Sequence, residues 1–431
     1  MNHSGKRIHR LLLAAALVAA VPTMARADDD RGKGPVDVEL GDRPFYLIDG
    51  MDDGPLKSRL MSCRKGPFKR TDFSIGHRGA ALQFPEHTKE SYEAGARQGA
   101  GIVECDVTFT RDGQLVCRHA ENDLHTTTNI LVTPLASTCI KPFAPAMIDA
   151  NGNVVTPASA ECRASALTLA EFKSLTGKMD AFNRAARNAA EYLGGTASWR
   201  TDLYTGRGTL MSFRDSIELN QRLGVKHTPE LKGGDPATIA QVFGSQENYA
   251  LAFAAELRNA RVKPRDVWPQ SFNVEDVFTW IDKTEYGRQA VYLLDYDANT
   301  DDIVIQPPYD QMPRADYFRM LKQRGVRIIA PPMPALLAVD AAGRIVPSPL
   351  AKDLKDWGFD IITWTIERSD LRRGASRAGY YYDFDPQGVA VKKDSDLYPV
   401  LDVLAREVKV LGIFSDWPAT VTYYANCMRL K

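Results

Sequence analysis

The stretch GIVECDVTFTRDGQLVCRH, residues 101–119, decides the fold. Two β-rich runs, Ile102–Phe109 and Leu115–His119, flank Asp112-Gly113, and an Asp-Gly pair between such runs is a strong hairpin signal. A tight hairpin joins only antiparallel strands. We therefore expect Leu115–His119 to return along its partner and to lie outside any parallel sheet that the first run helps to build.

Further β-rich runs alternate with helical stretches from Thr71 onward. Such alternation is typical of a parallel sheet with helices packed outside it. Together with Ile102–Phe109, these runs supply the eight strands of a TIM barrel. We predict an α/β fold, a TIM-type (β/α)8 barrel with a β-hairpin at the top of strand 2. The further runs are Phe73–His77, Lys226–Leu231, Trp268–Phe272, Ala290–Leu294, Val326–Ala330, Ile361–Ile366 and Leu411–Ser415.

The hairpin also predicts which side chains face each other. If Asp112 and Gly113 are the only loop residues, Asp106 lies opposite His119, and both share one face with Glu104. Cys105 then points to the other face while Cys117 shares the face of His119, so we expect no bond between these cysteines. A longer loop with a bulge would shift the count by one.

The N-terminus has the pattern of a secretory signal. A basic start at residues 6–10 precedes the apolar run Leu11–Val21, and Ala25-Arg26-Ala27 gives a cleavage site. The apolar run is too short to span a bilayer. We predict a signal peptide at 1–27, an N-terminal extension at 28–70 and the barrel at 71–431, with a long insertion at about 131–210. The protein is then exported, periplasmic or secreted.

Charge and cysteine content constrain the partners. The 54 basic and 54 acidic residues balance, so nothing indicates nucleic acid or a stable membrane anchor. Disulfides persist outside the cytosol. Cys139 and Cys162 are the best candidate pair, and Cys63 and Cys427 could join the two ends of the main body, although sequence alone assigns neither pair.

Three carboxylates fall at the ends of predicted strands. Glu104 and Asp106 share one face of their strand, and Glu230 ends the next barrel strand. Taken alone, a Glu-x-Asp pair is usually solvated surface charge. Three converging carboxylates would repel unless a cation lay between them, and oxygen ligands suit Mg²⁺ or Ca²⁺.

Basic residues fall at the same end of the predicted barrel. His77 ends the first strand, and His119 is expected to return to the same rim, so two imidazoles could act as general acid and general base. Arg78 could bind a phosphate, and Lys232 adds a positive charge. Trp364 also ends a strand, where it could stack on a substrate. Together with a cation, this set fits phosphoryl-ester cleavage.

The ordered motifs resemble the glycerophosphodiester phosphodiesterase family, specifically its periplasmic, signal-peptide-bearing branch. Each motif is weak alone, but the set runs in the family's order from about Phe73 to Pro418. The motifs are His77-Arg78-Gly79, Pro85-Glu86-His87-Thr88, Glu104-Cys105-Asp106, Asp112-Gly113, His119, Glu230-Leu231-Lys232, Ser271-Phe272, Trp364-Thr365-Ile366 and Ser415-Asp416-Trp417-Pro418.

The resemblance implies a metal-dependent hydrolysis of glycerophosphodiesters to sn-glycerol 3-phosphate and an alcohol. It implies catalytic His77 and His119, and substrate contacts from Arg78 and Lys232. It also implies a divalent cation, Ca²⁺ or Mg²⁺, held by the three carboxylates. Glu86 is expected to support the metal ligands rather than to react.

Two positions depart from the family pattern, and two other functions stay open. His87 stands where the family commonly has Asn, and Ala120 where it commonly has Asp; both changes could alter metal affinity or rate. The alternatives are a phospholipase-type barrel enzyme acting on intact phospholipid and a non-catalytic phosphate-ligand-binding protein of the same fold. The leaving alcohol, the native metal and the oligomeric state are not determined by the sequence.

Overall fold

The computed structural model describes Met1 and residues 37–430. The expected signal peptide, residues 1–27, lies outside the described residues except for Met1. Contacts divide the chain into a first unit, Met1–Lys33, and a main unit, Gly34–Lys431, and every element described below belongs to the main unit. Among the described residues, no helix is long and apolar enough to cross a membrane.

Eight parallel strands form a closed barrel, as the sequence predicted. They follow one another in chain order, and β1 closes the ring by pairing with both β2 and β19. One more strand, β3 (Leu115–Cys117), is antiparallel to β2 and is not part of the ring, as the hairpin signal predicted. The barrel strands are β1 (Thr71–Gly76), β2 (Ala100–Phe109), β10 (Lys226–Leu231), β11 (Gln270–Ser271), β12 (Val291–Leu293), β15 (Ile328–Ala330), β18 (Asp360–Ile366) and β19 (Gly412–Ser415).

Alternation along β2 separates two packed layers. Val103, Cys105 and Val107 belong to the large core between strands and helices. Ile102 belongs to a second cluster, formed by side chains from six barrel strands that fill the barrel interior. Because successive strand side chains point to opposite faces, Glu104 and Asp106 follow Ile102 toward the interior.

Helices cover the outside of the barrel. Helix α7 shows why they form: Ser212 and Asp215 make a reciprocal capping box at its start, and Gly224 ends it in the left-handed conformation. Its buried face includes Phe213 and Ile217. The surrounding helices are α3 (Lys89–Arg97), α7 (Phe213–Leu223), α8 (Pro236–Phe243), α9 (Gln246–Asn259), α10 (Val274–Lys283), α11 (Arg314–Gln323), α12 (Pro349–Asp356), α13 (Leu397–Asp402), which continues as a π-helix (Val403–Val408), and α14 (Pro418–Met428).

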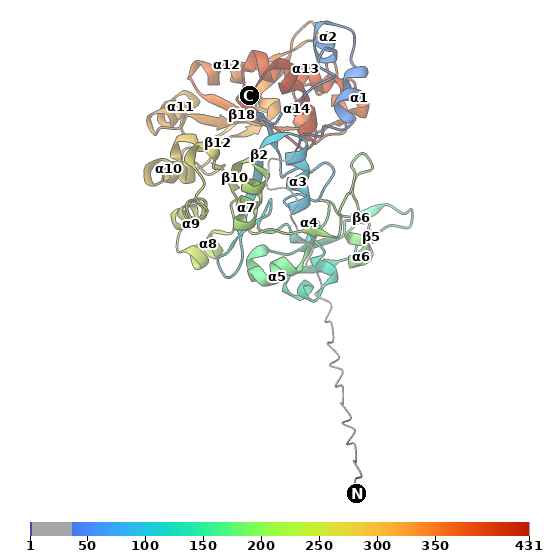
Figure 1. The fold of residues 1–431 in the computed structure, drawn as a ribbon, viewed down its shortest axis with the longest axis vertical. Coiled ribbons are helices and arrows are strands. Elements are labelled where there is room, and N and C mark those ends of the chain that lie inside the picture. The colour runs from blue at the N-terminus through green and yellow to red at the C-terminus, as the bar shows by residue number, and fades with distance from the viewer. Residues whose placement is uncertain (2–36, 431) are drawn as a thin grey trace. The chain divides into compact units, whose positions relative to one another are not determined.

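Two short helices precede the barrel. Helices α1 (Arg43–Asp49) and α2 (Pro55–Met61) pack against α14, and α1 also contacts α13 (Figure 1). A disulfide joins Cys63, just after α2, to Cys427 in α14. The described part of the predicted N-terminal extension is thus fixed to the last barrel helix, and the proposed link between the two ends of the main body is confirmed.

The segment between β3 and α7 folds around a small core of its own. This core contains Phe172 and Tyr192, and the disulfide Cys139–Cys162, predicted from sequence, lies within it. In Figure 1 its elements α5, α6, β5 and β6 gather below the barrel strands. They are α4 (Leu124–Thr127), β4 (Lys141–Ala144), β5 (Met147–Ile148), β6 (Val154–Thr156), β7 (Ser159–Glu161), α5 (Leu169–Ser174), β8 (Thr176–Gly177), α6 (Ala189–Tyr192) and β9 (Gly208–Thr209).

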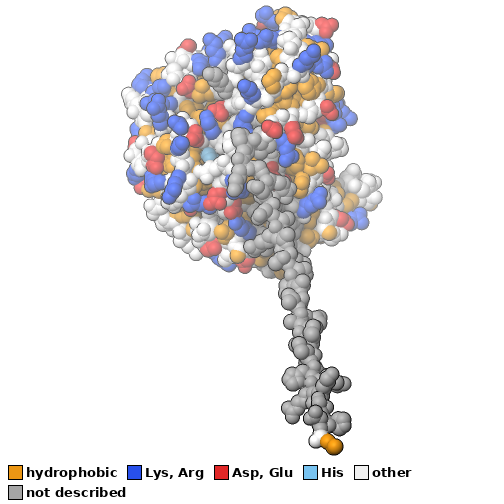
Figure 2. All heavy atoms as spheres, viewed as in Figure 1, with side chains coloured by type: hydrophobic (Ala, Val, Ile, Leu, Met, Phe, Trp, Pro, Cys, Tyr) orange, Lys and Arg blue, Asp and Glu red, His pale blue; other side chains and the backbone are white. Residues whose placement is uncertain are grey.

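Two small antiparallel ribbons lie in later loops. They are β13 (Asp295–Asp297) with β14 (Asp302–Val304), and β16 (Leu337–Val339) with β17 (Ile345–Pro347). On the surface seen in Figure 2, side chains of both charges are interspersed with hydrophobic ones. This mixture agrees with the balance of acidic and basic residues in the sequence.

The predicted hairpin register was wrong by one residue. Val107 pairs with Cys117, and Thr110 pairs with Gln114, so Arg111, Asp112 and Gly113 form a three-residue loop. Gly113 has φ +74°, the left-handed conformation that such loops require. The shift puts Cys105 and Cys117 on one face, and they form a disulfide, contrary to the prediction.

Candidate active site

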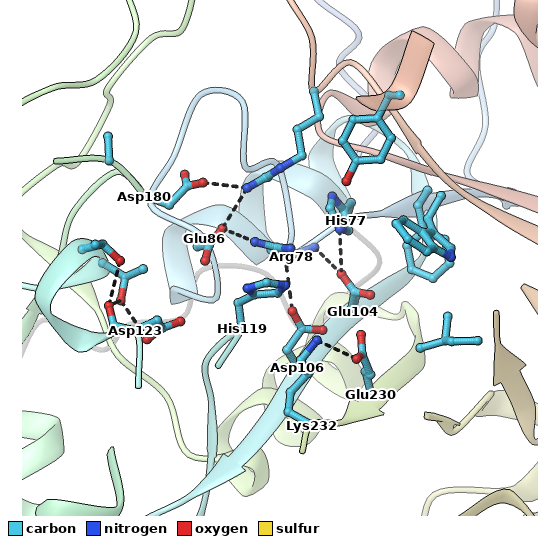
Figure 3. A pocket seen from close by; sticks show the side chains of 18 of the residues that line it. His77, Arg78, Glu86, Glu104, Asp106, His119, Asp123, Asp180, Glu230 and Lys232 are labelled. Carbon is cyan, nitrogen blue, oxygen red and sulfur yellow. Dashed lines mark hydrogen bonds and ion pairs between the residues drawn. The ribbon is translucent and has the colours of Figure 1, made fainter. Parts of the chain in front are cut away.

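A cavity of about 730 Å³ opens at the carboxyl ends of the barrel strands (Figure 3). This is the end of a TIM barrel where catalytic groups are found. Barrel strands, the hairpin arm and the insertion all contribute to its wall. Every site residue predicted from the sequence lines it: His77, Arg78, Glu86, Glu104, Asp106, His119, Glu230, Lys232 and Trp364.

The three predicted metal carboxylates form one buried cluster. Glu230 pairs in register with Asp106 of the neighbouring strand, and ligand atoms of Glu104, Asp106 and Glu230 lie within 4.8 Å of one another. One oxygen of Glu104 accepts from the Arg78 amide at 2.9 Å, and the other from Gln270 Nε2 at 2.9 Å. Asp106 Oδ1 is buried without a hydrogen-bond partner.

The pKa values of these carboxyl groups show that their negative charges repel one another. Burial, together with the charges of Asp106 and Glu230, raises the pKa of Glu104 well above its usual value. Burial also raises the pKa of Glu230 to about 7, although Lys232 Nζ donates to it at 2.6 Å. Carboxylates crowded in this way favour a bound cation or a shared proton.

His77 is held by a carboxylate that the sequence did not single out. Its Nδ1 is hydrogen-bonded to Asp416 Oδ1, and its Nε2 lies 3.8 Å from Glu104 Oε2. Burial lowers the pKa of His77, against the opposite influence of Asp416. Asp416 lies in the Ser-Asp-Trp-Pro motif just after β19, so its position at a strand end was the signal that could have identified it.

His119 reaches the cavity by a different route from the predicted one. In the observed register it would share the face of Cys117, but β3 ends at Cys117 and the chain bends there. Arg118 donates its amide hydrogen to the Asp106 carbonyl at 2.8 Å, and the next residue turns into the cavity (Figure 3). Burial, followed by the charges of Arg78 and Lys232, lowers the pKa of His119 well below its usual value.

Arg78 is surrounded by acidic side chains. Its guanidinium donates to Glu86 Oε2 at 2.7 Å and lies 3.5 Å from Asp106 Oδ2. Burial opposes the effect, but Arg78 and Arg368 together hold the pKa of Glu86 well below its usual value. Glu86 therefore stays ionised and orients Arg78, whereas its expected support of the metal ligands stays a prediction.

A partly buried guanidinium, that of Arg368, links this site to the insertion. Arg368 donates to Asp416 at 2.7 Å and to Asp180 of the insertion at 2.6 Å, and it lies 3.5 Å from Glu86. Asp180 also accepts from Arg200 at 2.6 Å. Sequence reasoning missed Arg368 and Asp180, because nothing in the insertion's sequence indicated which of its residues contact the barrel.

Both departures from the family pattern have structural partners. His87, with φ 55°, places Nε2 2.9 Å from Asp106 Oδ2 and Nδ1 3.2 Å from the Tyr92 hydroxyl. It therefore orients a predicted metal ligand. At the second position, the backbone amide of Ala120 donates to Asp123 Oδ2 at 3.1 Å. The carboxylate of Asp123, three residues later, therefore lies next to the position where the family commonly has an Asp.

Aromatic side chains form another part of the wall. Trp364 donates Nε1–H to the Ala330 carbonyl at 2.9 Å, and its ring lies edge-on to Phe272 with centroids 5.8 Å apart. Tyr381 also lines the cavity and contacts Trp364 edge-on. These contacts fix the Trp364 ring in the wall of the cavity that the carboxylate cluster also lines.

Comparison with known proteins agrees with this arrangement. Residues 77–420 match the glycerophosphoryl diester phosphodiesterase family. An extracellular protein of Arthroderma benhamiae is 40% identical over 254 residues, which cover 58% of this chain and all of that protein. A Mycobacterium tuberculosis protein described as a glycerophosphodiester phosphodiesterase is 53% identical over 47 residues, 11% of this chain and 17% of its own length.

A solved structure supports the fold. A glycerophosphoryl diester phosphodiesterase structure from Silicibacter pomeroyi has a TM-score of 0.51 and 19% identity, covering 86% of this chain and 97% of its own. At that identity the likeness shows the barrel alone. The family match spans both predicted histidines and all three carboxylates. The chain therefore belongs to the glycerophosphoryl diester phosphodiesterase family, as its ordered motifs predicted, and is an enzyme of that class.

Proposed function

We propose that this enzyme hydrolyses glycerophosphodiesters to sn-glycerol 3-phosphate and an alcohol, with a divalent cation and two catalytic histidines. One observation carries the proposal: a carboxylate cluster, two imidazoles and the basic side chains of Arg78 and Lys232 line a single cavity. Each group has a distinct task in phosphoryl transfer, and Arg78 and Lys232 would hold the non-bridging phosphate oxygens.

The residues present fit a Mg²⁺ or Ca²⁺ ion. Glu104, Asp106 and Glu230 offer oxygen ligands close together, and the partnerless Asp106 Oδ1 is a buried acceptor without a donor. A bound cation would supply positive charge for the phosphate and for the reacting oxygens. His87 would keep Asp106 oriented, since ring N–H groups commonly fix the carboxylates that hold metals.

The histidine contacts suggest different roles. Asp416 accepts a hydrogen bond from the Nδ1–H of His77, which leaves Nε2 as a proton acceptor facing the cavity. We assign His77 as the first base. His119 lacks a carboxylate partner among the described residues, and burial, followed by the charges of Arg78 and Lys232, disfavours its protonation. A bound phosphate would offset those two charges and favour protonation of His119, which could then act as the acid.

The proposed first step uses the substrate's own hydroxyl. The hydroxyl oxygen on carbon 2 attacks phosphorus while its proton passes to His77 Nε2, and the leaving alcohol takes a proton from His119. A five-membered cyclic phosphate forms because the tethered hydroxyl gains a large entropic advantage over water. Water then opens the ring, giving its proton to His119, while His77 returns a proton to oxygen 2.

The test is release of glycerol 3-phosphate from glycerophosphocholine, with and without chelator. Activity that needs a divalent cation supports the proposal, and no release of glycerol 3-phosphate from any glycerophosphodiester would refute it. A substrate analogue with hydrogen in place of the 2-hydroxyl tests the mechanism separately. If that analogue binds and is cleaved at the normal rate, direct attack by water replaces the cyclic step.

Export is part of the proposal. The three disulfides join all six cysteines, and such bonds persist in oxidising compartments. The Arthroderma benhamiae relative is described as extracellular. Sequencing the N-terminus of the secreted protein tests this: a start near Asp28 is expected, and retention of residues 1–27 in the mature protein would contradict it.

A further inference from the structure

The cavity continues past the proposed catalytic groups to a second side. We define the insertion side as Asp123, Thr126, Thr127, Ala181, Phe182 and Arg184, all of which line the cavity. Figure 3 shows Asp123 and the carboxylate cluster on opposite sides of His119 in that view. In an in-line displacement the attacking and leaving oxygens lie on opposite sides of phosphorus. If glycerol lies beside Trp364, the leaving alcohol extends toward the insertion side.

Asp123 is fixed at this side by its own backbone surroundings. Its Oδ2 accepts from the Ala120 amide at 3.1 Å, and its Oδ1 accepts from the Thr127 hydroxyl at 3.1 Å. These bonds hold the carboxylate in one orientation on the cavity wall. Burial raises the pKa of Asp123 to about 6, and the charge of Arg118 offsets only part of that rise.

Among the described residues, Asp123 differs from the other carboxylates on the wall because it forms no ion pair, although the charge of Arg118 acts on it. Within residues 37–430, no Lys, Arg or His lies within ion-pair distance of it. The buried guanidinium of Arg118 donates instead to the carbonyls of Cys117 and Glu86. The remaining carboxylates either belong to the cluster or have partners, which are Arg78 for Glu86, Arg200 and Arg368 for Asp180, and Lys232 for Glu230.

We propose that Asp123 recognises a leaving alcohol that carries a positively charged nitrogen, as in ethanolamine or choline diesters. The inference rests on the proposed function and names the substrate class for it. An enclosed carboxylate without an ion-pair partner gains most from a cationic ligand, because charges interact more strongly away from bulk water. Phe182, stacked on Tyr192 with centroids 5.0 Å apart, adds an aromatic surface of the kind that binds ammonium groups.

Arg184 does not reverse this preference. Its side chain also lines the insertion side, but it is exposed to solvent, where salt and water screen its charge. Asp123 is only partly exposed, and two hydrogen bonds hold its carboxylate in place. Its charge is therefore less mobile and less screened by solvent than the charge of Arg184. The enclosed carboxylate should therefore dominate the selectivity between leaving alcohols.

The experiment compares kcat/KM for three diesters that share the glycerol phosphate part. Glycerophosphoethanolamine and glycerophosphocholine are cationic on the alcohol side, and glycerophosphoglycerol is neutral. The wild-type enzyme should favour the cationic pair by about 10-fold or more. Asp123→Asn, which keeps an acceptor for Ala120, should lower kcat/KM for the cationic pair by about 10- to 100-fold, because the amide no longer attracts the positive charge of the alcohol in this enclosed site, and should change the neutral substrate by about 2-fold or less.

The matched control is Asp149→Asn, in the exposed hairpin turn of the same insertion, where the carboxylate accepts from the amides of Asn151 and Asn153. It should leave all three values unchanged. Equal kcat/KM for all three substrates in the wild type would overturn the inference even if Asp123→Asn fails to fold. So would an equal loss on all three substrates. If none of the three diesters releases glycerol 3-phosphate, the proposed function itself fails.

Discussion

Arg368→Lys is expected to slow the reaction without weakening substrate binding. Arg368 spreads its guanidinium between Asp416, which holds His77, and Asp180, which belongs to the insertion. A lysine keeps the positive charge but cannot donate to both carboxylates in the same geometry. We infer that Arg368 is a positioning residue, acting on His77 through Asp416.

The size of the effect follows from the one hydrogen bond that a lysine at this position cannot make. One hydrogen bond to a charged group contributes about 1.5–3 kcal/mol. If that energy keeps His77 aligned in the transition state, its loss lowers kcat by about 10- to 150-fold, at 1.36 kcal/mol for each tenfold. Asp180→Asn, which leaves the bond from Arg368 to Asp416, should cost less, and Asp416→Asn should cost the most.

Steady-state kinetics with glycerophosphocholine separate positioning from binding. The prediction is a lower kcat with a nearly constant KM in all three variants. The decrease in kcat should be largest for Asp416→Asn, smaller for Arg368→Lys and smallest for Asp180→Asn. Arg258→Lys provides a matched control, because that guanidinium also forms two bonds to one carboxylate, Glu285, but at the surface. A raised KM with unchanged kcat in Arg368→Lys would show that Arg368 binds substrate instead, and the positioning role would be abandoned.

Other predictions address the metal, the acid, a disulfide and a buried histidine. Glu104→Gln should weaken binding of Mg²⁺ or Ca²⁺ in calorimetric titration, and chelation should abolish wild-type activity; full activity of metal-stripped enzyme would contradict the cluster's role. His119→Ala should lower kcat by about 10²–10⁴-fold with metal affinity unchanged, and loss of the metal would mean the assignment is wrong. The double variant Cys105→Ser/Cys117→Ser should lose about 3 kcal/mol of unfolding free energy by the chain-entropy estimate, measured by urea denaturation; an unchanged value would rule out that cross-link. Burial lowers the pKa of His227 to about 4, so as the pH falls the unfolded chain takes up this proton before the folded chain does. The contribution of His227 to the free energy of unfolding is therefore fully present above about pH 6.5 and falls by about 3 kcal/mol toward pH 4. His227→Asn should lose less stability over that range.

The barrel could be predicted because its signals are local. Each strand is a short β-rich run bounded by turn residues, and Asp112-Gly113 identified the one run that does not join the ring. The site followed from the same signals, since side chains at the carboxyl ends of parallel strands converge whatever the loops do. That is why Glu104, Asp106 and Glu230 could be placed together before any distance was known.

The errors and omissions have physical causes. A single extra loop residue reversed the expected faces of Cys105 and Cys117, because strand side chains alternate with a period of two. Arg368 and Asp180 meet across 188 positions of sequence. Contacts of that kind depend on how the insertion packs on the barrel, and the insertion's short strands and turns carry no periodic pattern from which its orientation could be inferred.

Charge balance in the cavity connects the metal, the phosphate and the proposed alcohol. Its wall carries six acidic side chains and four lysine or arginine side chains. With all six carboxyl groups ionised, that excess of two negative charges would repel an anionic diester, so the proposed divalent cation would favour substrate binding as well as chemistry. With the cation present the wall is neutral, and a phosphodiester then brings one negative charge. A protonated His119 would balance that charge at the phosphate, and a positive nitrogen on the leaving alcohol would pair with Asp123, for which a neutral alcohol offers no partner. This charge balance therefore predicts a preference for zwitterionic diesters, and it predicts that chelation raises KM in addition to lowering kcat.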